Sequence, residues 1–262
     1  MQDGFIKVAC ATPDIKVADT KHNALAIIEL IKKAADCNVK IICFPELCVT
    51  GYTCGDLFLQ DTLLREAELA IENIAMETAG IDIVSIVGLP YLVGQKLYNI
   101  AVVITRGKVI GGVAKQNLPN YSEFYEMRHF TASDYGFETE ISIGEQKSIP
   151  LSNKQIYSCS TMQNLKFGIE LCEDLWVANS PSIRLAESGA TIIFNLSASD
   201  EVIGKSDYRR TIIKAKSGSL CCGYLYADAG IGESTQDMVS LGIILLLRME
   251  LYCRRQSYSK MK

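Results

Sequence analysis

Three short segments of the chain each place a reactive side chain at the end of an apolar run. Glu46, Lys115 and Cys172 all come within two residues of such a run, and each run reads as a buried strand. Loops at the ends of buried strands bring residues that are far apart in sequence to one sheet edge. A carboxylate, an ammonium group and a thiol are therefore the candidate catalytic set.

These three side-chain types suit acyl transfer through a thioester. A thiol has an unperturbed pKa of about 8.5 and needs a neighbouring base or cation to react near neutrality. Glu46 is a candidate base for Cys172, and Lys115 is a candidate for stabilising the oxyanion that forms when a carbonyl is attacked. Taken singly, each residue is better explained as an ordinary core, loop or surface residue.

The local sequences around the three residues distinguish between these interpretations. FPEL at 44–47, KQNLPNYSEFYEMRHF at 115–130 and ELCEDLW at 170–176 resemble the Glu, Lys and Cys motifs of the nitrilase superfamily. Four further segments resemble the branch formed by the N-terminal glutaminase domains of glutamine-dependent NAD synthetases: GYTCGDLF at 51–58, NLSAS at 195–199, DYRR at 207–210 and GESTQD at 232–237. The combined resemblance covers about residues 4–239.

The resemblance implies a role for each residue of the catalytic set. Glu46 would be the general base, Lys115 would stabilise the tetrahedral intermediate, and Cys172 would carry a glutamyl thioester. Water would then hydrolyse the thioester and release glutamate and ammonia. L-glutamine is thus the expected substrate, and no metal or organic cofactor is implied.

The same resemblance implies a substrate pocket lined by five residues: Tyr121, Phe124, Glu173, Ser199 and Lys205. Glu173 suits the α-ammonium group of glutamine, and Lys205 suits its carboxylate. Ser199 and Lys205 read equally well as surface-loop residues. Glu123 is expected to support Lys115 or to position water.

Three alternatives stay open at this point. His129 stands where relatives commonly have an aromatic residue, so a Cys172/His129 dyad is a second mechanism, although it leaves Glu46 and Lys115 without a role. A stand-alone carbon-nitrogen hydrolase acting on another small amide is a second function. An inactive fragment that serves only in oligomerisation is a third.

Strand-like and helix-like segments alternate along the chain, which predicts an α/β protein. Strands are expected at 5–11, 39–44, 83–87, 97–105, 108–114, 166–171, 191–196 and 224–227, and helices at 23–35, 62–78, 181–188 and 208–217. The segment 115–137 lacks periodicity and is expected to be a functional loop. The resemblance implies an αββα four-layer sandwich with a single domain at 1–240.

The segment 241–262 departs from the pattern of the family. Relatives continue with a closing strand pair resembling G-H-N-x-I-x-E-N-G, and one back-translation of 241–262 read two bases later gives that continuation. We therefore hypothesise a frameshift near Ser240, with the apolar run 243–247 either frayed or added to the sheet as a replacement strand. No Ser-Gly-Gly-x-Asp-Ser loop or Walker loop occurs, so ATP and deamido-NAD are expected to belong to a synthetase domain missing from this sequence.

Composition restricts the remaining function classes. The chain has 262 residues and a net charge of −4, without an aromatic-interleaved basic stripe, so nucleic-acid binding is not expected. No signal peptide and no bilayer-length apolar run is recognisable, which predicts a cytoplasmic protein without a membrane partner. The ten cysteines show no C-x-x-C pair, and the two histidines lack ligand spacing, so neither disulfides nor a metal site are predicted. Homo-oligomerisation is expected from the resemblance.

Overall fold

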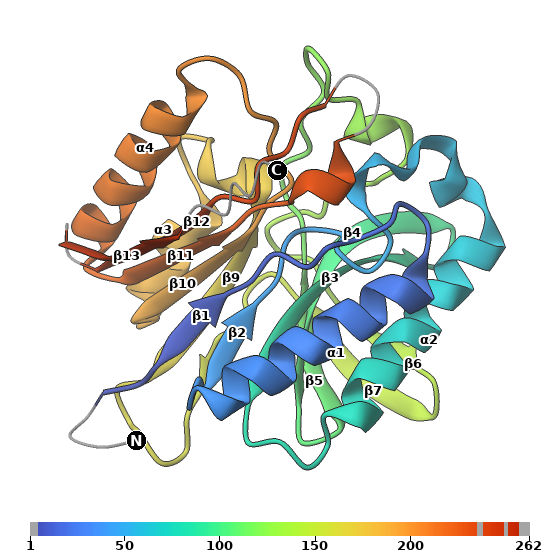
Figure 1. The fold of residues 1–262 in the computed structure, drawn as a ribbon, viewed down its shortest axis with the longest axis horizontal. Coiled ribbons are helices and arrows are strands. Elements are labelled where there is room, and N and C mark those ends of the chain that lie inside the picture. Colours follow the sequence, from blue (N-terminus) through green and yellow to red (C-terminus); the bar gives the residue numbers. More distant parts are fainter. Residues whose placement is uncertain (1–4, 235–237, 249–250, 257–262) are drawn as a thin grey trace, which may run out of the picture.

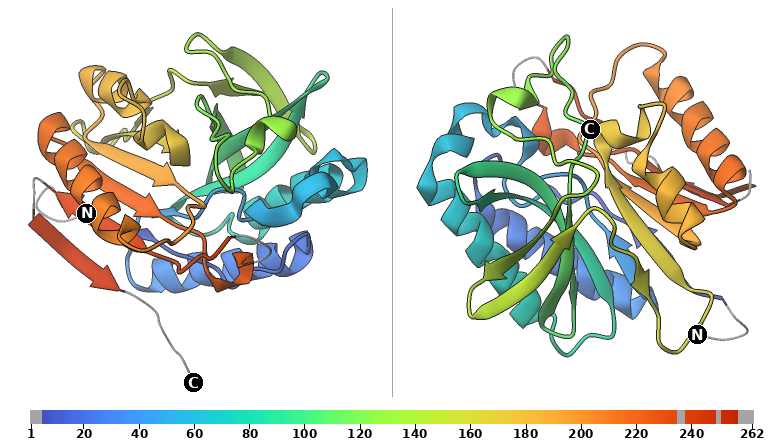
Figure 2. Two further views of the ribbon diagram at one scale, coloured as in Figure 1. Left: turned by 90° about the horizontal axis from the view of Figure 1, so that it is seen from above. Right: turned by 180° about the vertical axis from the view of Figure 1, so that it is seen from behind.

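The structure is a computed structural model that describes residues 5–234, 238–248 and 251–256. In this part of the chain, two β-sheets pack face to face, and each carries helices on its outer face (Figures 1 and 2). Helices α1 (Thr20–Asp36) and α2 (Asp61–Glu77) cover the first sheet, whereas α3 (Pro181–Glu187) and α4 (Lys205–Leu220) cover the second. The predicted α/β class and αββα layer order are confirmed.

The first sheet has the strand order β1-β2-β3-β4-β5-β7-β6. Its strands are β1 (Val8–Cys10), β2 (Ile41–Cys43), β3 (Val84–Val93), β4 (Lys96–Thr105), β5 (Lys108–Ala114), β6 (Glu138–Ile143) and β7 (Gln146–Ser152). β1, β2 and β3 are parallel, and β3, β4 and β5 form an antiparallel meander. The predicted turn at Arg106-Gly107 joins β4 to β5, and both residues have positive φ angles.

The second sheet has the strand order β13-β12-β11-β10-β9-β8. Its strands are β8 (Tyr157–Ser158), β9 (Lys166–Leu171), β10 (Ile192–Leu196), β11 (Gly223–Ala227), β12 (Ile244–Arg248) and β13 (Leu251–Gln256). The central strands β9, β10 and β11 are parallel, so their carboxyl ends meet at one edge. Strands buried on both faces are mostly apolar, and in β10 four of the five residues are apolar, with Asn195 as the polar exception.

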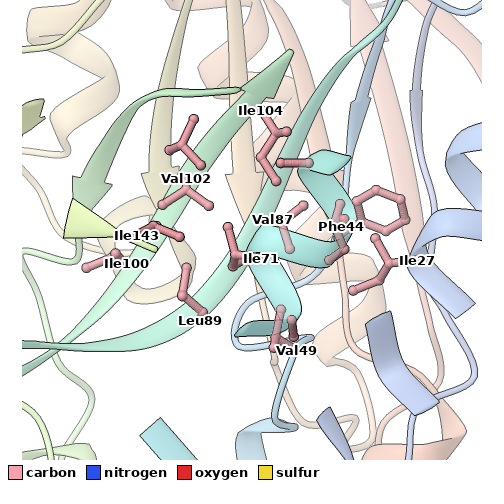
Figure 3. Close-up of a cluster of buried hydrophobic side chains, with 14 of the residues drawn as sticks. Ile27, Phe44, Val49, Ile71, Val87, Leu89, Ile100, Val102, Ile104 and Ile143 are labelled. Carbon is pink, nitrogen blue, oxygen red and sulfur yellow. The ribbon is translucent and has the colours of Figure 1, made fainter. Parts of the chain in front are cut away.

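Three apolar clusters hold the four layers together. The cluster between α1, α2 and the first sheet includes Ile27 and Ile71, which Figure 3 shows among the side chains of Phe44, Val87 and Leu89. A second cluster fills the space between the sheets, and a third lies between the second sheet and helices α3 and α4. Burial of apolar area on this scale is the main stabilising term for such a fold.

Several elements differ from the sequence prediction, and β3, for example, runs to Val93 rather than to residue 87. The hairpin β6–β7 was not predicted, because charged and apolar residues are mixed in its strands and only part of each strand faces the core. Helix α4 begins at Lys205 rather than at residue 208, directly after Gly204, whose φ of 86° requires a left-handed backbone. The earlier start places Lys205 in the first turn of the helix.

The segment after residue 240 adds to the second sheet. β12 pairs antiparallel with β11, and β13 pairs with β12. Leu245 packs with the cluster beside α4, whereas Leu246 packs with the cluster between the sheets. The apolar run therefore forms an added strand of the second sheet, which was one of the two predicted outcomes. Residues 249–250 and 257–262 of the predicted tail lie outside the described part.

None of the helices in the described part of the chain is both long enough and apolar enough to cross a membrane.

Candidate active site

Glu46 lies in the loop that follows β2, and its side chain is fully buried. Its Oε1 accepts a hydrogen bond from Asn99 Nδ2 at 2.6 Å, and its Oε2 accepts one from the backbone N–H of Ala198 at 3.1 Å. Gly88 makes room for this loop, since a Cβ at Gly88 would lie 2.5 Å from the backbone nitrogen of Leu47. The carboxylate is thus fixed from both sheets.

Lys115 follows β5, and its side chain is also fully buried. Its Nζ donates to Oε1 of Glu46 at 2.5 Å and to Oε1 of Glu126 at 2.6 Å. Burial acts to lower the pKa of Lys115, but the carboxylates of Glu126 and Glu46 outweigh it and hold that pKa well above its ordinary value. The ammonium group is therefore charged at neutral pH.

Cys172 begins the 3-10 helix η3 (Cys172–Leu175) at the end of β9 and has a positive φ of 41°. Such a conformation is uncommon for a residue other than glycine and directs the side chain out of the strand. Asp174 fixes the turn by accepting from the backbone N–H of Leu171 at 3.1 Å and from the backbone N–H of Asn117 at 2.9 Å. Asp174 thereby ties the Cys172 turn to the loop after Lys115.

The electrostatic surroundings keep the Cys172 thiol protonated at rest. Burial raises its pKa well above the ordinary value, and the nearby Glu46 carboxylate raises it further. Lys115 and the backbone amide of Ala198 act in the opposite direction but do not cancel these effects. A thiol in this setting reacts when a base removes its proton during the attack.

The carboxylate expected from Glu123 is supplied by Glu126. Glu126 is buried and binds Lys115 as above, and its Oε1 also accepts from the hydroxyl of Tyr52 at 2.7 Å. Burial raises the pKa of Glu126 to about 7. The Glu123 side chain instead interacts with Asp200, which raises its pKa. The two residues are three positions apart in one irregular loop, so spacing alone could not distinguish them.

A cleft of about 420 Å³ opens beside Cys172. It is lined by all five residues expected at the substrate pocket: Tyr121, Phe124, Glu173, Ser199 and Lys205. The Tyr121 hydroxyl donates to Glu173 at 3.0 Å, and burial raises the pKa of Glu173. Lys205 forms an ion pair with Asp200, and its Nζ lies 5.3 Å from the centre of the Phe124 ring. The cleft thus presents a negatively charged group, Glu173, and a positively charged group, Lys205.

A buried arginine that was not among the predicted site residues contacts Ser199 of this cleft. Arg209 of α4 is fully buried; it donates to Glu201 at 2.9 Å and to the Ser199 hydroxyl at 3.3 Å, and it lies 3.7 Å from Asp228. Asp228 accepts from the backbone N–H of Ser199 at 2.8 Å. The position of Ser199 therefore depends on Arg209 and Asp228.

His129 does not belong to the cleft that Cys172 lines. Its Nε2 lies 2.9 Å from Oδ1 of Asp56, and its ring packs against Phe58. The alternative Cys172/His129 dyad therefore has no geometric support. Within the described ranges, no group of three or more His, Cys, Asp or Glu side chains is arranged to hold a metal ion.

Fold and site together define a class of protein. Two sheets between outer helices, with a buried Glu-Lys-Cys cluster at the carboxyl ends of the strands, characterise a hydrolase of the nitrilase superfamily. The model of the carbon-nitrogen hydrolase family matches residues 7–217. The chain therefore belongs to the carbon-nitrogen hydrolase family, and the predicted enzyme class is confirmed.

Within the carbon-nitrogen hydrolase family, the chain is similar to glutamine-dependent NAD(+) synthetases. The chain is 36% identical over 237 residues to the glutamine-dependent NAD(+) synthetase of Mycobacterium tuberculosis, which covers 90% of this chain and 35% of the relative. It is 28% identical over 256 residues to the synthetase of the same name from Aquifex aeolicus, covering 98% of this chain and 41% of the relative. The chain thus spans about two fifths or less of these relatives, and the predicted resemblance is confirmed.

Solved structures agree with this placement. A glutamine-dependent NAD(+) synthetase from Cytophaga hutchinsonii matches with a TM-score of 0.84 and 31% identity, covering 95% of this chain and 40% of that one. An amidase of the nitrilase superfamily from Nesterenkonia matches with a TM-score of 0.75 at 14% identity, covering 96% of this chain and 86% of that one. The second match shows the shared fold.

Proposed function

We propose that the chain hydrolyses the side-chain amide of L-glutamine through a thioester on Cys172. The observation that carries this proposal is the buried contact of Lys115 with Glu46 and Glu126, beside a thiol that opens onto a cleft with Glu173 and Lys205.

The proposed reaction has two halves. In the first, Glu46 takes the proton of the Cys172 thiol as Sγ attacks the amide carbon, and Lys115 stabilises the oxyanion. The proton passes from Glu46 to the departing nitrogen, and ammonia leaves as the C–N bond breaks. In the second half, Glu46 takes a proton from water, the hydroxide adds to the thioester carbon, and glutamate leaves as the thiol recovers its proton.

Charge in the cleft supports glutamine as the substrate. We propose that Glu173 binds the α-ammonium group and that Lys205 binds the α-carboxylate, because both line the cleft of Cys172 and each carries the charge opposite to its partner's. Tyr121, Phe124 and Ser199 are proposed to complete the pocket. Asp200 already pairs with Lys205, so the substrate carboxylate would have to share this cation with it.

The relatives are glutamine-dependent NAD(+) synthetases, which suggests where the ammonia goes. We propose that the chain supplies ammonia for glutamine-dependent NAD synthesis, in which ATP and deamido-NAD would bind to a separate synthetase domain. Homo-oligomerisation through this domain is proposed on the same resemblance. These assignments are proposals, because the chain spans only part of each relative.

A substrate panel tests the proposal. L-glutamine should be hydrolysed with a kcat/KM at least about 100-fold above that of butyramide, which lacks both α groups, because the charged groups of the pocket would stay unpaired with the smaller amide. The Cys172→Ala variant is the control for contaminating activity. Equal rates for the two substrates would favour a small-amide hydrolase, and no hydrolysis of either would favour an inactive fragment.

A further inference from the structure

Glu233 is a buried carboxylate that takes part in no step of the proposed reaction. It ends the short 3-10 helix η4 (Ile231–Glu233), and its side chain is turned toward the segment after Gly51. Both carboxylate oxygens accept from the backbone N–H of Tyr52, at 2.8 Å and 2.9 Å, and Oε2 also accepts from the N–H of Thr53 at 3.3 Å. One side chain thus holds two consecutive backbone amides.

The amides held by Glu233 begin the segment η1 (Tyr52–Leu59), which reaches the catalytic cluster. The Tyr52 hydroxyl donates to Oε1 of Glu126 at 2.7 Å, and this is the same oxygen that accepts from Lys115 at 2.6 Å. Glu233 therefore connects to Lys115 through only two intervening side chains.

The backbone is tightly packed on both sides of the contact between Glu233 and the Tyr52 amide, at Gly51 and at Gly232. Gly51 has a φ of 89°, and a Cβ at this position would lie 3.3 Å from Oε2 of Glu233. A Cβ at Gly232 would lie 2.2 Å from the carbonyl oxygen of Ile15. A side chain at either glycine would displace the carboxylate or the amides that it binds, so the contact depends on close approach of two backbones.

We propose that Glu233 is a positioning residue for the hydrolytic reaction, acting through Tyr52 and Glu126 on the ammonium group of Lys115. The proposal rests on the proposed function in assigning Lys115 to the oxyanion. Glu233 lies outside residues 7–217, the range that matches the family model, so the catalytic cluster depends on a segment beyond that range. An alternative role for Glu233 is to satisfy two buried amides and stabilise the fold, without effect on Lys115.

A double-mutant cycle distinguishes the two roles. Glu233→Gln weakens the hold on the Tyr52 amide, and Tyr52→Phe removes only the hydroxyl that binds Glu126. Glu170→Gln is the matched control, because Glu170 is an equally buried carboxylate that binds the Ser182 N–H at 2.8 Å and the Tyr224 hydroxyl. Two rates are measured for every variant: kcat for L-glutamine, and the alkylation rate of Cys172 by iodoacetamide, followed by intact mass.

The positioning role predicts coupled effects. Glu233→Gln and Tyr52→Phe should each lower both rates by about 10-fold to 100-fold, because small misplacements of catalytic groups have effects of this size. Hydrolysis slows because Lys115 no longer meets the oxyanion. Alkylation forms no oxyanion, and it slows because a displaced Lys115 no longer lowers the pKa of the Cys172 thiol. The double variant should be within about twofold of Tyr52→Phe alone, with KM little changed. Glu170→Gln should lose stability without losing either rate. Glu233→Asp, which keeps the charge and shortens the side chain, replaces Glu233→Gln if the latter does not fold.

Independent effects would overturn the proposal. The proposal fails if Glu233→Gln leaves both rates unchanged. It also fails if the fold-loss in rate of the double variant equals the product of the fold-losses of Glu233→Gln and Tyr52→Phe. A wild-type chain that alkylates Cys172 but does not hydrolyse glutamine would contradict the proposed function instead, and the alkylation cycle would still decide the role of Glu233.

Discussion

Lys115 Nζ lies 2.5 Å from Oε1 of Glu46, and both side chains are fully removed from solvent. A buried ion pair contributes little net stability because desolvation of the two charges offsets their attraction, whereas removal of one partner costs about 3–5 kcal/mol. We therefore attribute the buried pair to catalysis, for which it fixes the charges of Glu46 and Lys115 in advance, and not to stability. Since Glu126 also contacts Lys115, the cluster holds two carboxylates and one cation.

The first prediction separates Glu126 from Glu123. Glu126→Gln should lower kcat for glutamine by about 100-fold to 1000-fold, because the variant loses a charge that keeps Lys115 protonated and oriented. Glu123→Gln is the matched change three residues earlier and should retain kcat within about threefold. Steady-state kinetics of both variants provide the test. A larger loss in Glu123→Gln than in Glu126→Gln would restore the original assignment.

A second prediction concerns recognition of the α groups. Glu173→Gln should raise KM for glutamine by about 10-fold or more, because a hydrogen bond to a charged group contributes about 1.5–3 kcal/mol. The alkylation rate of Cys172 by iodoacetamide should stay unchanged, since this reagent has no α-ammonium group. If kcat/KM for glutamine were unaffected, Glu173 would not bind the substrate.

Arg209 provides a third prediction, which concerns stability. Arg209→Met should lower the free energy of unfolding by about 3–5 kcal/mol, because Glu201 and Asp228 would lose a buried cation. Arg210→Met is the adjacent control, since Arg210 pairs with the exposed Asp207 and such pairs contribute about 0–1 kcal/mol. Urea unfolding measures both, and equal losses would contradict the account of the buried network.

A fourth prediction follows from the raised pKa of Asp174. Burial raises this pKa to about 7 from an ordinary value of 3.8. Between those pH values Asp174 holds a proton in the folded chain that it has lost in the unfolded chain, so its contribution lowers the free energy of unfolding as pH rises, by at most about 1.4 kcal/mol per pH unit. Asp174→Asn should flatten this dependence in urea unfolding between about pH 5 and pH 7. An unchanged slope would show that Asp174 is already ionised across this range.

Much of the site could be predicted from sequence because the catalytic residues follow strands. Glu46, Lys115 and Cys172 come within two residues of apolar runs, and the structure places Glu46 after the carboxyl end of β2 and Cys172 after that of β9. Glu126 was missed because its loop has no regular period and Glu123 fits the same motif equally well. Its identity became visible only through the contacts with Lys115 and Tyr52.

The remaining misses have a common physical origin in long-range packing. Arg209 reads as a surface residue of a polar helix, but it is buried because Glu201 from the loop before α4 and Asp228 from the segment after β11 both approach it. Glu233 likewise contacts residues 180 positions away or more, which no local pattern encodes. The pairing of β12 with β11 was left open because apolar runs do not specify a partner strand.

The central claim is that Cys172 attacks a bound glutamine, and intact-mass spectrometry tests it most directly. The chain is incubated with diazo-oxo-norleucine, an electrophile derived from glutamine, with and without excess L-glutamine, alongside Cys172→Ala. We predict one adduct per wild-type chain, protection by glutamine, and no adduct on the variant. A soluble wild-type chain without an adduct, or an adduct that persists in Cys172→Ala, would contradict the claim.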